Sequence, residues 1–172
     1  MATGFVDKKV HTVFLGLREP KVNELLFGVE IEMEGKTPIF RLSKDNEVWN
    51  WVNDGSLKSP VDNIEYVFKT PLPLDKAIKG VSDLYDTLKK NSTVIANSMR
   101  AGVHIHVNCQ NLTIRQLFTF LAAYHAMEIV ITRSFGEDRV GNLFCLRLID
   151  ADFLTTAIRL GLESERIRDY LL

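Results

Sequence analysis

The stretch FGVEIEME, residues 27–34, carries the clearest structural signal in this chain of 172 residues. Its apolar side chains alternate strictly with glutamates and a glycine, and a period of two is typical of a β-strand with one buried face. The expected core face consists of Phe27, Val29, Ile31 and Met33, and the expected polar face of Gly28, Glu30, Glu32 and Glu34.

A second stretch, GVHIHVNC at residues 102–109, alternates in the same way. Its valines, isoleucine and cysteine predict another core face, while His104 and His106 share the opposite face with Asn108. Two separate strands therefore each combine an apolar face with a face that carries side chains able to bind metal ions.

Turn signals and apolar periodicity place the other expected elements around these two strands. Strands are expected at 47–53 and 63–69, with 38–42 as a hairpin partner of the first strand. Helices are expected at 75–90 and from Thr113, with Gln116 in capping-box position. Two shorter helices are expected to follow, one from after Asp150 or Asp152 to near Gly161 and one from Ser164 onward. This order predicts an α+β fold, a mostly antiparallel sheet with helices packed on one face. Because no linker interrupts it, residues 1–172 are expected to form a single domain.

Composition argues against several partners and compartments. The 46% apolar and 25% charged fractions are ordinary for a globular protein, and a net charge of −1 gives no general attraction to nucleic acid or anionic membranes. No apolar run approaches the roughly 20 residues that cross a bilayer. Cys109 and Cys145 form neither a disulfide framework nor a C-x-x-C zinc site. We therefore expect a cytoplasmic protein that binds neither nucleic acid nor membrane.

The polar faces of the two strands suggest a cation site. Glu30 and Glu32 are two residues apart on one face, so their carboxylates lie roughly 6–7 Å apart, and His104 and His106 have the same spacing. Either pair alone is often a solvated strand face. Several carboxylates that meet on one sheet face beside an imidazole, however, repel one another unless cations neutralise them. An oxygen-rich set with a minority of nitrogen suits Mg²⁺ or Mn²⁺.

Four motifs in order resemble those of the amidoligase family, whose relatives include glutamine synthetase and glutamate–cysteine ligase. The first strand resembles the opening G-x-E-x-E motif, and Trp51 with Asp54-Gly55-Ser56 and then Glu65 resembles the following block. The remaining two motifs are a small-Gly-x-H-x-H strand, here residues 101–106, and an R-x-x-N-x-aromatic-C block, here Arg139, Asn142, Phe144 and Cys145.

The resemblance implies a glutamine-synthetase-like sheet and an ATP-dependent carboxyl–amine ligase that forms an amide through an acyl phosphate. Its substrates would be a small-molecule or peptide carboxylate and an amine. It implies roles for seven side chains: Glu30, Glu32, Glu65 and His104 hold Mg²⁺ or Mn²⁺ with Asp54 in support, while His106 and Arg139 face ATP phosphates or the acyl phosphate.

Relatives continue past the helical region into strands with a further E-x-R pattern, which Glu163-Ser164-Glu165-Arg166 matches poorly. Three explanations stay open. The chain is part of a longer protein, a second chain in a homo-oligomer or partner complex completes the site, or the chain is a reduced relative without activity.

Two other functions also stay open. One is a non-catalytic interaction or assembly module associated with bacteriophages, located in the host cytoplasm. The other is a metal-dependent hydrolase or oxygenase built on the H-x-H strand. The remaining histidines, His11 and His125, have no ligand partner at diagnostic spacing and are expected to be structural or surface residues.

Overall fold

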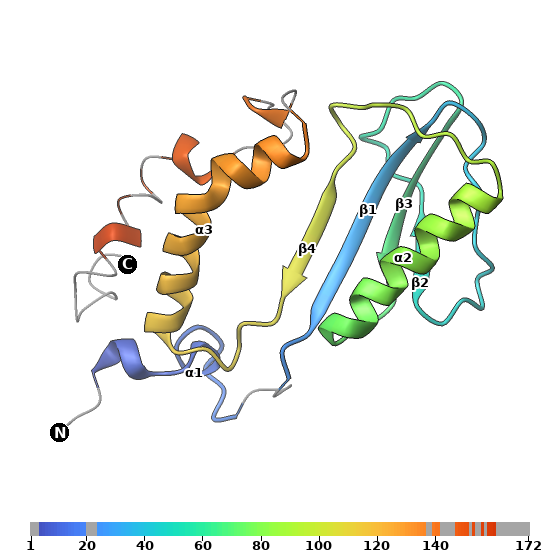
Figure 1. The fold of residues 1–172 in the computed structure, drawn as a ribbon. Coiled ribbons are helices and arrows are strands. Elements are labelled where there is room, and N and C mark those ends of the chain that lie inside the picture. The colour runs from blue at the N-terminus through green and yellow to red at the C-terminus, as the bar shows by residue number, and fades with distance from the viewer. Residues whose placement is uncertain are drawn as a thin grey trace. The chain divides into compact units, whose positions relative to one another are not determined.

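The computed structural model describes residues 4–19, 24–136, 139–141, 147–151, 153, 156 and 158–160. They belong to two compact units. The sheet unit is Leu25–Asn108, and the helical unit combines Met1–Glu24 with Cys109–Leu172. Figure 1 shows the elements of each unit. The single domain expected from the sequence stays a prediction.

The sheet unit is built on four antiparallel strands in the order β2-β3-β1-β4. Their bounds are Phe27–Gly35 for β1, Trp49–Val52 for β2, Asp62–Phe68 for β3 and Val103–Val107 for β4. Strands were expected at all four places, and each alternating stretch forms one. The α+β class with an antiparallel sheet is confirmed, while the closer likeness to glutamine synthetase stays a prediction.

Helix α2, Leu74–Lys90, packs on the apolar face of this sheet (Figure 1). Its buried Ala77, Leu84 and Leu88 join the strand residues of one core cluster. Trp49 is 3% exposed, packs against the Phe68 ring and donates its indole N–H to the Gly80 carbonyl at 3.1 Å. The helix therefore leaves the opposite face of the sheet, which carries the glutamates, uncovered by α2.

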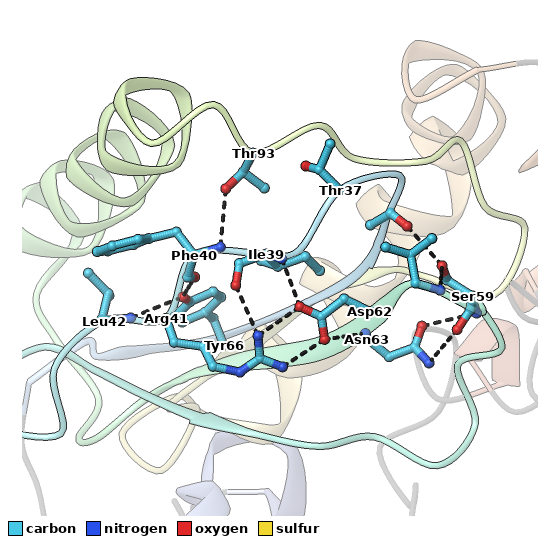
Figure 2. Close-up of polar contacts among 12 residues, drawn as sticks. Thr37, Ile39, Phe40, Arg41, Leu42, Ser59, Asp62, Asn63, Tyr66 and Thr93 are labelled. Atoms are coloured by element: carbon cyan, nitrogen blue, oxygen red, sulfur yellow. Dashed lines mark hydrogen bonds and ion pairs between the residues drawn. The ribbon is translucent and has the colours of Figure 1, made fainter.

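The expected hairpin partner at residues 38–42 is wrong, because this segment forms no strand. Figure 2 shows the reason: side chains of β3 take up its backbone N–H groups. Ile39 N donates to Asp62 Oδ2 at 2.7 Å, and Leu42 N donates to the Tyr66 hydroxyl at 3.3 Å. Pro38 has no N–H to offer a ladder. Side-chain hydrogen bonds have replaced backbone pairing.

Strand β4 lies at the edge of the described sheet, beside β1. Its expected core face is exposed, with Val103 at 55% and Ile105 at 64%. Alternation correctly predicted which β4 side chains share a face. It did not predict that the apolar face of an edge strand lies outside the core that α2 covers.

The helical unit contains η1 (Phe5–Asp7), α1 (Val10–Phe14), α3 (Ile114–Ser134) and η3 (Leu148–Asp150). Thr113 caps α3 with the expected capping box, since its hydroxyl accepts from Gln116 N while the Gln116 side chain accepts from Thr113 N. The buried Glu128 of α3 accepts a 2.6 Å hydrogen bond from Leu148 N, which ties η3 to the helix. The helix expected from Ser164 lies outside the described residues.

Among the helices that the structure describes, none combines the length and apolarity that crossing a bilayer requires.

Candidate metal centre

Strand register brings the predicted site residues of the sheet unit onto one face. Glu30 of β1 pairs with His104 of β4, and Glu32 of β1 pairs with Glu65 of β3. Directly paired residues point their side chains to the same side of a sheet. Asp54 follows β2, the strand on the far side of β3 from β1, and Val52 of β2 pairs with Glu65. Residues from four segments of the sequence therefore meet on the face opposite α2.

Glu30 lies between the two histidines of β4. Its Oε2 is 3.1 Å from His104 Nδ1, and its Oε1 is 3.2 Å from His106 Nε2. With Nδ1 of His104 facing Glu30, its Nε2 is directed toward the rest of the site. A carboxylate that contacts one imidazole nitrogen fixes the ring orientation and leaves the other nitrogen available as a ligand.

Glu32 is held by the loop before β4. Gly102 N donates to Glu32 Oε2 at 2.9 Å. A Cβ atom built on Gly102 would lie 3.5 Å from both Glu32 Oε2 and His104 Nε2, so this glycine keeps open the space that these two atoms face. Gly102 was not among the expected site residues, although the small-Gly-x-H-x-H motif contains it.

Glu65 and Asp54 have opposite electrostatic environments. Burial raises the pKa of Glu65, and the neighbouring charges of Glu30, Asp54 and Glu32 raise it further. By contrast, hydrogen bonds from the Ser56 backbone and hydroxyl to Asp54, both 2.8 Å, lower the pKa of Asp54. Glu65 therefore bears most directly the repulsion that a bound cation would relieve.

The family comparison matches this chain to the family described as "Putative amidoligase enzyme" over residues 63–171. That range contains Glu65, His104 and His106, and the register sets Glu30 and Glu32 beside them from outside it. The chain belongs to the amidoligase family. No curated protein and no solved structure matches it.

The donor chemistry of this sheet face fits a hard divalent cation, since it offers four carboxylates and two imidazoles. As placed, no three or more His, Cys, Asp or Glu side chains of the described residues form a group that could hold a metal ion. Both Glu30 oxygens face imidazoles, and Glu32 Oε2 accepts from Gly102 N. Cation binding would therefore require side-chain rotations that free these oxygens.

Arg139, which is also expected at the site, lies in the helical unit. Arg139 is half-buried in the turn after α3, where its N–H donates to Gly136 O at 3.1 Å. Its expected role in binding an anion stays a prediction. Asn142, Phe144 and Cys145 of the same motif, and the Glu163–Arg166 segment, lie outside the described residues.

The two remaining histidines also belong to the helical unit. His11 is buried in α1, with Nδ1 3.1 Å from Leu17 O. His125 lies on α3, with Nδ1 3.9 Å from Glu128 Oε2. Both positions agree with the structural role expected for them.

Glu34, on the polar strand face, was expected to be an ordinary surface residue at the strand end. This expectation is wrong, because Glu34 is buried, with 9% of its surface exposed. Its Oε1 accepts from the Lys58 and Ser59 backbone N–H groups, and the bond from Lys58 is the main reason that its pKa is lowered. A carboxylate can replace water with backbone donors in this way. No local sequence signal shows that residues 58–59 lie beside the end of β1.

Proposed function

We propose that the chain is an ATP-dependent carboxyl–amine ligase, with Mg²⁺ or Mn²⁺ bound on the polar face of the sheet. One observation supports it most strongly: strand register gathers Glu30, Glu32, Glu65 and His104 on one face in a member of the amidoligase family. The charges of Glu30, Glu32 and Asp54 all disfavour the charged form of Glu65, a repulsion that a bound cation would relieve.

In this proposal the side chains have distinct tasks. Glu32, Glu65 and Glu30 provide carboxylate oxygens for the cations. His104 adds Nε2, because its Nδ1 faces Glu30. Hydrogen bonds from Ser56 favour the charged form of Asp54, and this negative charge near the site makes its electrostatic potential more attractive to a cation. Bound Mg²⁺ or Mn²⁺ would neutralise ATP phosphates and the charge that develops during phosphoryl transfer.

His106 and Arg139 are proposed to bind anionic groups during the reaction. His106 lies at the open edge of the sheet, where its side chain is 66% exposed and its Nε2 faces Glu30. An N–H of its imidazole would donate to a phosphate oxygen of ATP or of the acyl phosphate. Arg139 would supply a planar, bidentate contact to a carboxylate or the transferring phosphoryl group.

Hydroxylamine provides a test that does not require the natural amine. Full-length protein is incubated with ATP, Mg²⁺, hydroxylamine and a panel of carboxylates, and hydroxamate and ADP are measured together. An acyl phosphate is trapped as hydroxamate, so the two products should form in equal amounts. Glu32→Gln and His104→Ala should lower the rate at least about a hundredfold, as expected for the loss of transition-state charge stabilisation. The matched control, Glu47→Gln, removes an exposed carboxylate just before β2.

Two sets of results would contradict the ligase proposal. If no carboxylate gives hydroxamate and calorimetry detects neither ATP nor Mn²⁺ binding, the ligase assignment is wrong and a non-catalytic assembly module replaces it. Iron or zinc recovered with the purified protein would instead support a hydrolase or oxygenase that uses the H-x-H strand.

A further inference from the structure

A groove lies over the end of β1, within the sheet unit, and no function has been assigned to it above. Its volume is about 600 Å³, within the roughly 300–1,000 Å³ typical of small-molecule sites. Two segments form its walls, 58–61 and 96–100, and the end of β1, from Glu34 to Lys36, forms its floor.

Hydrogen bonds hold both walls to the floor. Ser59 Oγ donates to Gly35 O at 2.8 Å, and Ala96 N donates to Glu34 O at 2.7 Å. The Glu34 carboxylate joins the two walls, since it accepts from Lys58 and Ser59 N on one side and bonds the Ser98 side chain on the other. The groove is therefore a constructed feature of the fold rather than a gap between loose loops.

The lining of the groove is cationic and partly apolar. Lys36, Lys58 and Arg100 outnumber the single carboxylate, Glu34, whose charge interacts with Arg100. Pro60, Val61 and Met99 contribute apolar surface. Such a lining attracts an anionic group carried on a short apolar chain.

The groove also adjoins the candidate metal centre. Glu34 follows Glu32 by two residues on the same face, a distance of about 7 Å along a strand. Arg100 precedes Gly102, whose N–H binds Glu32 Oε2. A molecule of moderate length can therefore reach both places.

We propose that this groove, the cationic groove, binds a second anionic group of the carboxylate substrate. The inference rests on the proposed function, because it assumes that the reacting carboxylate sits at the metal centre. It narrows the substrate class to molecules that carry two anionic groups separated by a short chain, such as a dicarboxylate or a peptide with an acidic end.

Two probes that differ in one carboxylate test this proposal. Calorimetry measures the affinity of full-length protein, with Mn²⁺ present, for adipate and for hexanoate. Adipate should bind at least about tenfold more tightly, the usual size of one charge-assisted contact. Arg100→Gln and Lys36→Gln should each remove most of this preference and leave hexanoate binding and Mn²⁺ affinity unchanged. Lys76→Gln, an exposed lysine of α2, is the charge-matched control and should keep the preference.

The outcomes separate this proposal from the proposed function. If adipate and hexanoate bind with equal affinity, or if Lys76→Gln loses the preference for adipate as fully as Arg100→Gln does, the proposed role of the cationic groove is wrong. The proposed metal centre is unaffected by either result. A preference for adipate that survives when Glu30→Gln abolishes Mn²⁺ binding supports the groove by itself. If Arg100→Gln weakens ATP binding and leaves the adipate preference intact, the groove binds nucleotide phosphates and the proposal is overturned. Lys36 is exposed, so Lys36→Gln is expected to fold normally. It therefore tests the groove even if Arg100→Gln fails to fold.

Discussion

At the scale of single residues, Glu65 is a carboxylate whose charged form is disfavoured by its surroundings. It faces Glu32 directly across the β1–β3 pair, and burial together with three neighbouring carboxylates raises its pKa. Like charges directly opposite each other on two strands destabilise a sheet. Glu65 therefore lowers the stability of the sheet, and we infer that this carboxylate has a role other than stability.

We therefore predict that Glu65→Gln stabilises the metal-free protein at neutral pH by about 0.2–1 kcal/mol and weakens Mn²⁺ binding. Because the pKa of Glu65 is raised in the folded state, protonation relieves the repulsion in the wild type. The stability difference should shrink as pH falls through that pKa. Urea unfolding in EDTA across a pH series measures it. A variant that is less stable at neutral pH would contradict the prediction, and Glu47→Gln is the control.

The Arg41–Asp62 ion pair, shown in Figure 2, stabilises a charged carboxylate, whereas the surroundings of Glu65 destabilise one. Two 2.7 Å hydrogen bonds from the Arg41 guanidinium lower the pKa of Asp62 from 3.8 to about 2. A carboxyl whose pKa is lowered on folding contributes stability above its unfolded pKa and loses it as pH falls through the folded pKa.

Asp62→Asn should therefore cost about 1–2 kcal/mol at neutral pH, allowing for solvent screening at the half-exposed guanidinium, and the cost should fall away between about pH 4 and pH 2. Acid titration of stability, followed by circular dichroism, tests this window. Asp83→Asn, which removes an exposed helix pair with Lys79, should show almost no such dependence. An equal acid dependence in both variants would refute the assignment.

At the scale of elements, the contact between α2 and the sheet depends on a glycine. A Cβ atom on Gly80 would lie 3.1 Å from Val48 Cγ1 and 3.4 Å from the Phe68 ring. The Gly80 carbonyl also accepts the Trp49 indole N–H. The helix backbone therefore approaches the sheet more closely at this point than a larger residue would allow.

Gly80→Ala should destabilise the protein by about 1 kcal/mol, because overpacking costs about 1–3 kcal/mol while the gain in helix propensity returns at most about 1 kcal/mol. Thermal and urea unfolding measure the balance. Ser82→Ala, at an exposed position of the same helix, should be neutral or slightly stabilising. Stabilisation by Gly80→Ala would show that the sheet can yield at this contact.

At the scale of the whole molecule, the chain divides into a sheet unit and a helical unit, and all the proposed carboxylate ligands lie in the sheet unit. A ligand that binds the folded state stabilises it in proportion to the logarithm of its concentration over Kd. Local unfolding becomes less frequent in the segments that the ligand contacts, and their amide hydrogens exchange more slowly.

Mn²⁺ at about a hundred times its Kd should therefore stabilise the protein by about 2.7 kcal/mol, and hydrogen exchange should slow most in β1, β3, β4 and the loop around Asp54. Amides of α3 should respond less. The measurement is exchange mass spectrometry of the full chain with and without Mn²⁺. Glu32→Gln, with the same metal, is the control and should lose the effect. Protection concentrated in α3 would place the cation in the helical unit instead.

The sequence by itself determined those features that depend on neighbouring residues. The alternation in residues 27–34 and 102–109 predicted two strands and which of their side chains share a face. Thr113 and Gln116 predicted the start of α3, since a capping box involves one turn of backbone. The ordered motifs also predicted the amidoligase family that the comparison confirms.

Only the tertiary structure decided how these parts meet. Register between strands more than thirty residues apart sets Glu32 opposite Glu65 and Glu30 opposite His104. Long-range hydrogen bonds bury Glu34, keep residues 38–42 out of the sheet and form the cationic groove. Periodicity reports which side of its own element a residue occupies, whereas burial and pairing depend on which distant groups satisfy its backbone and charge.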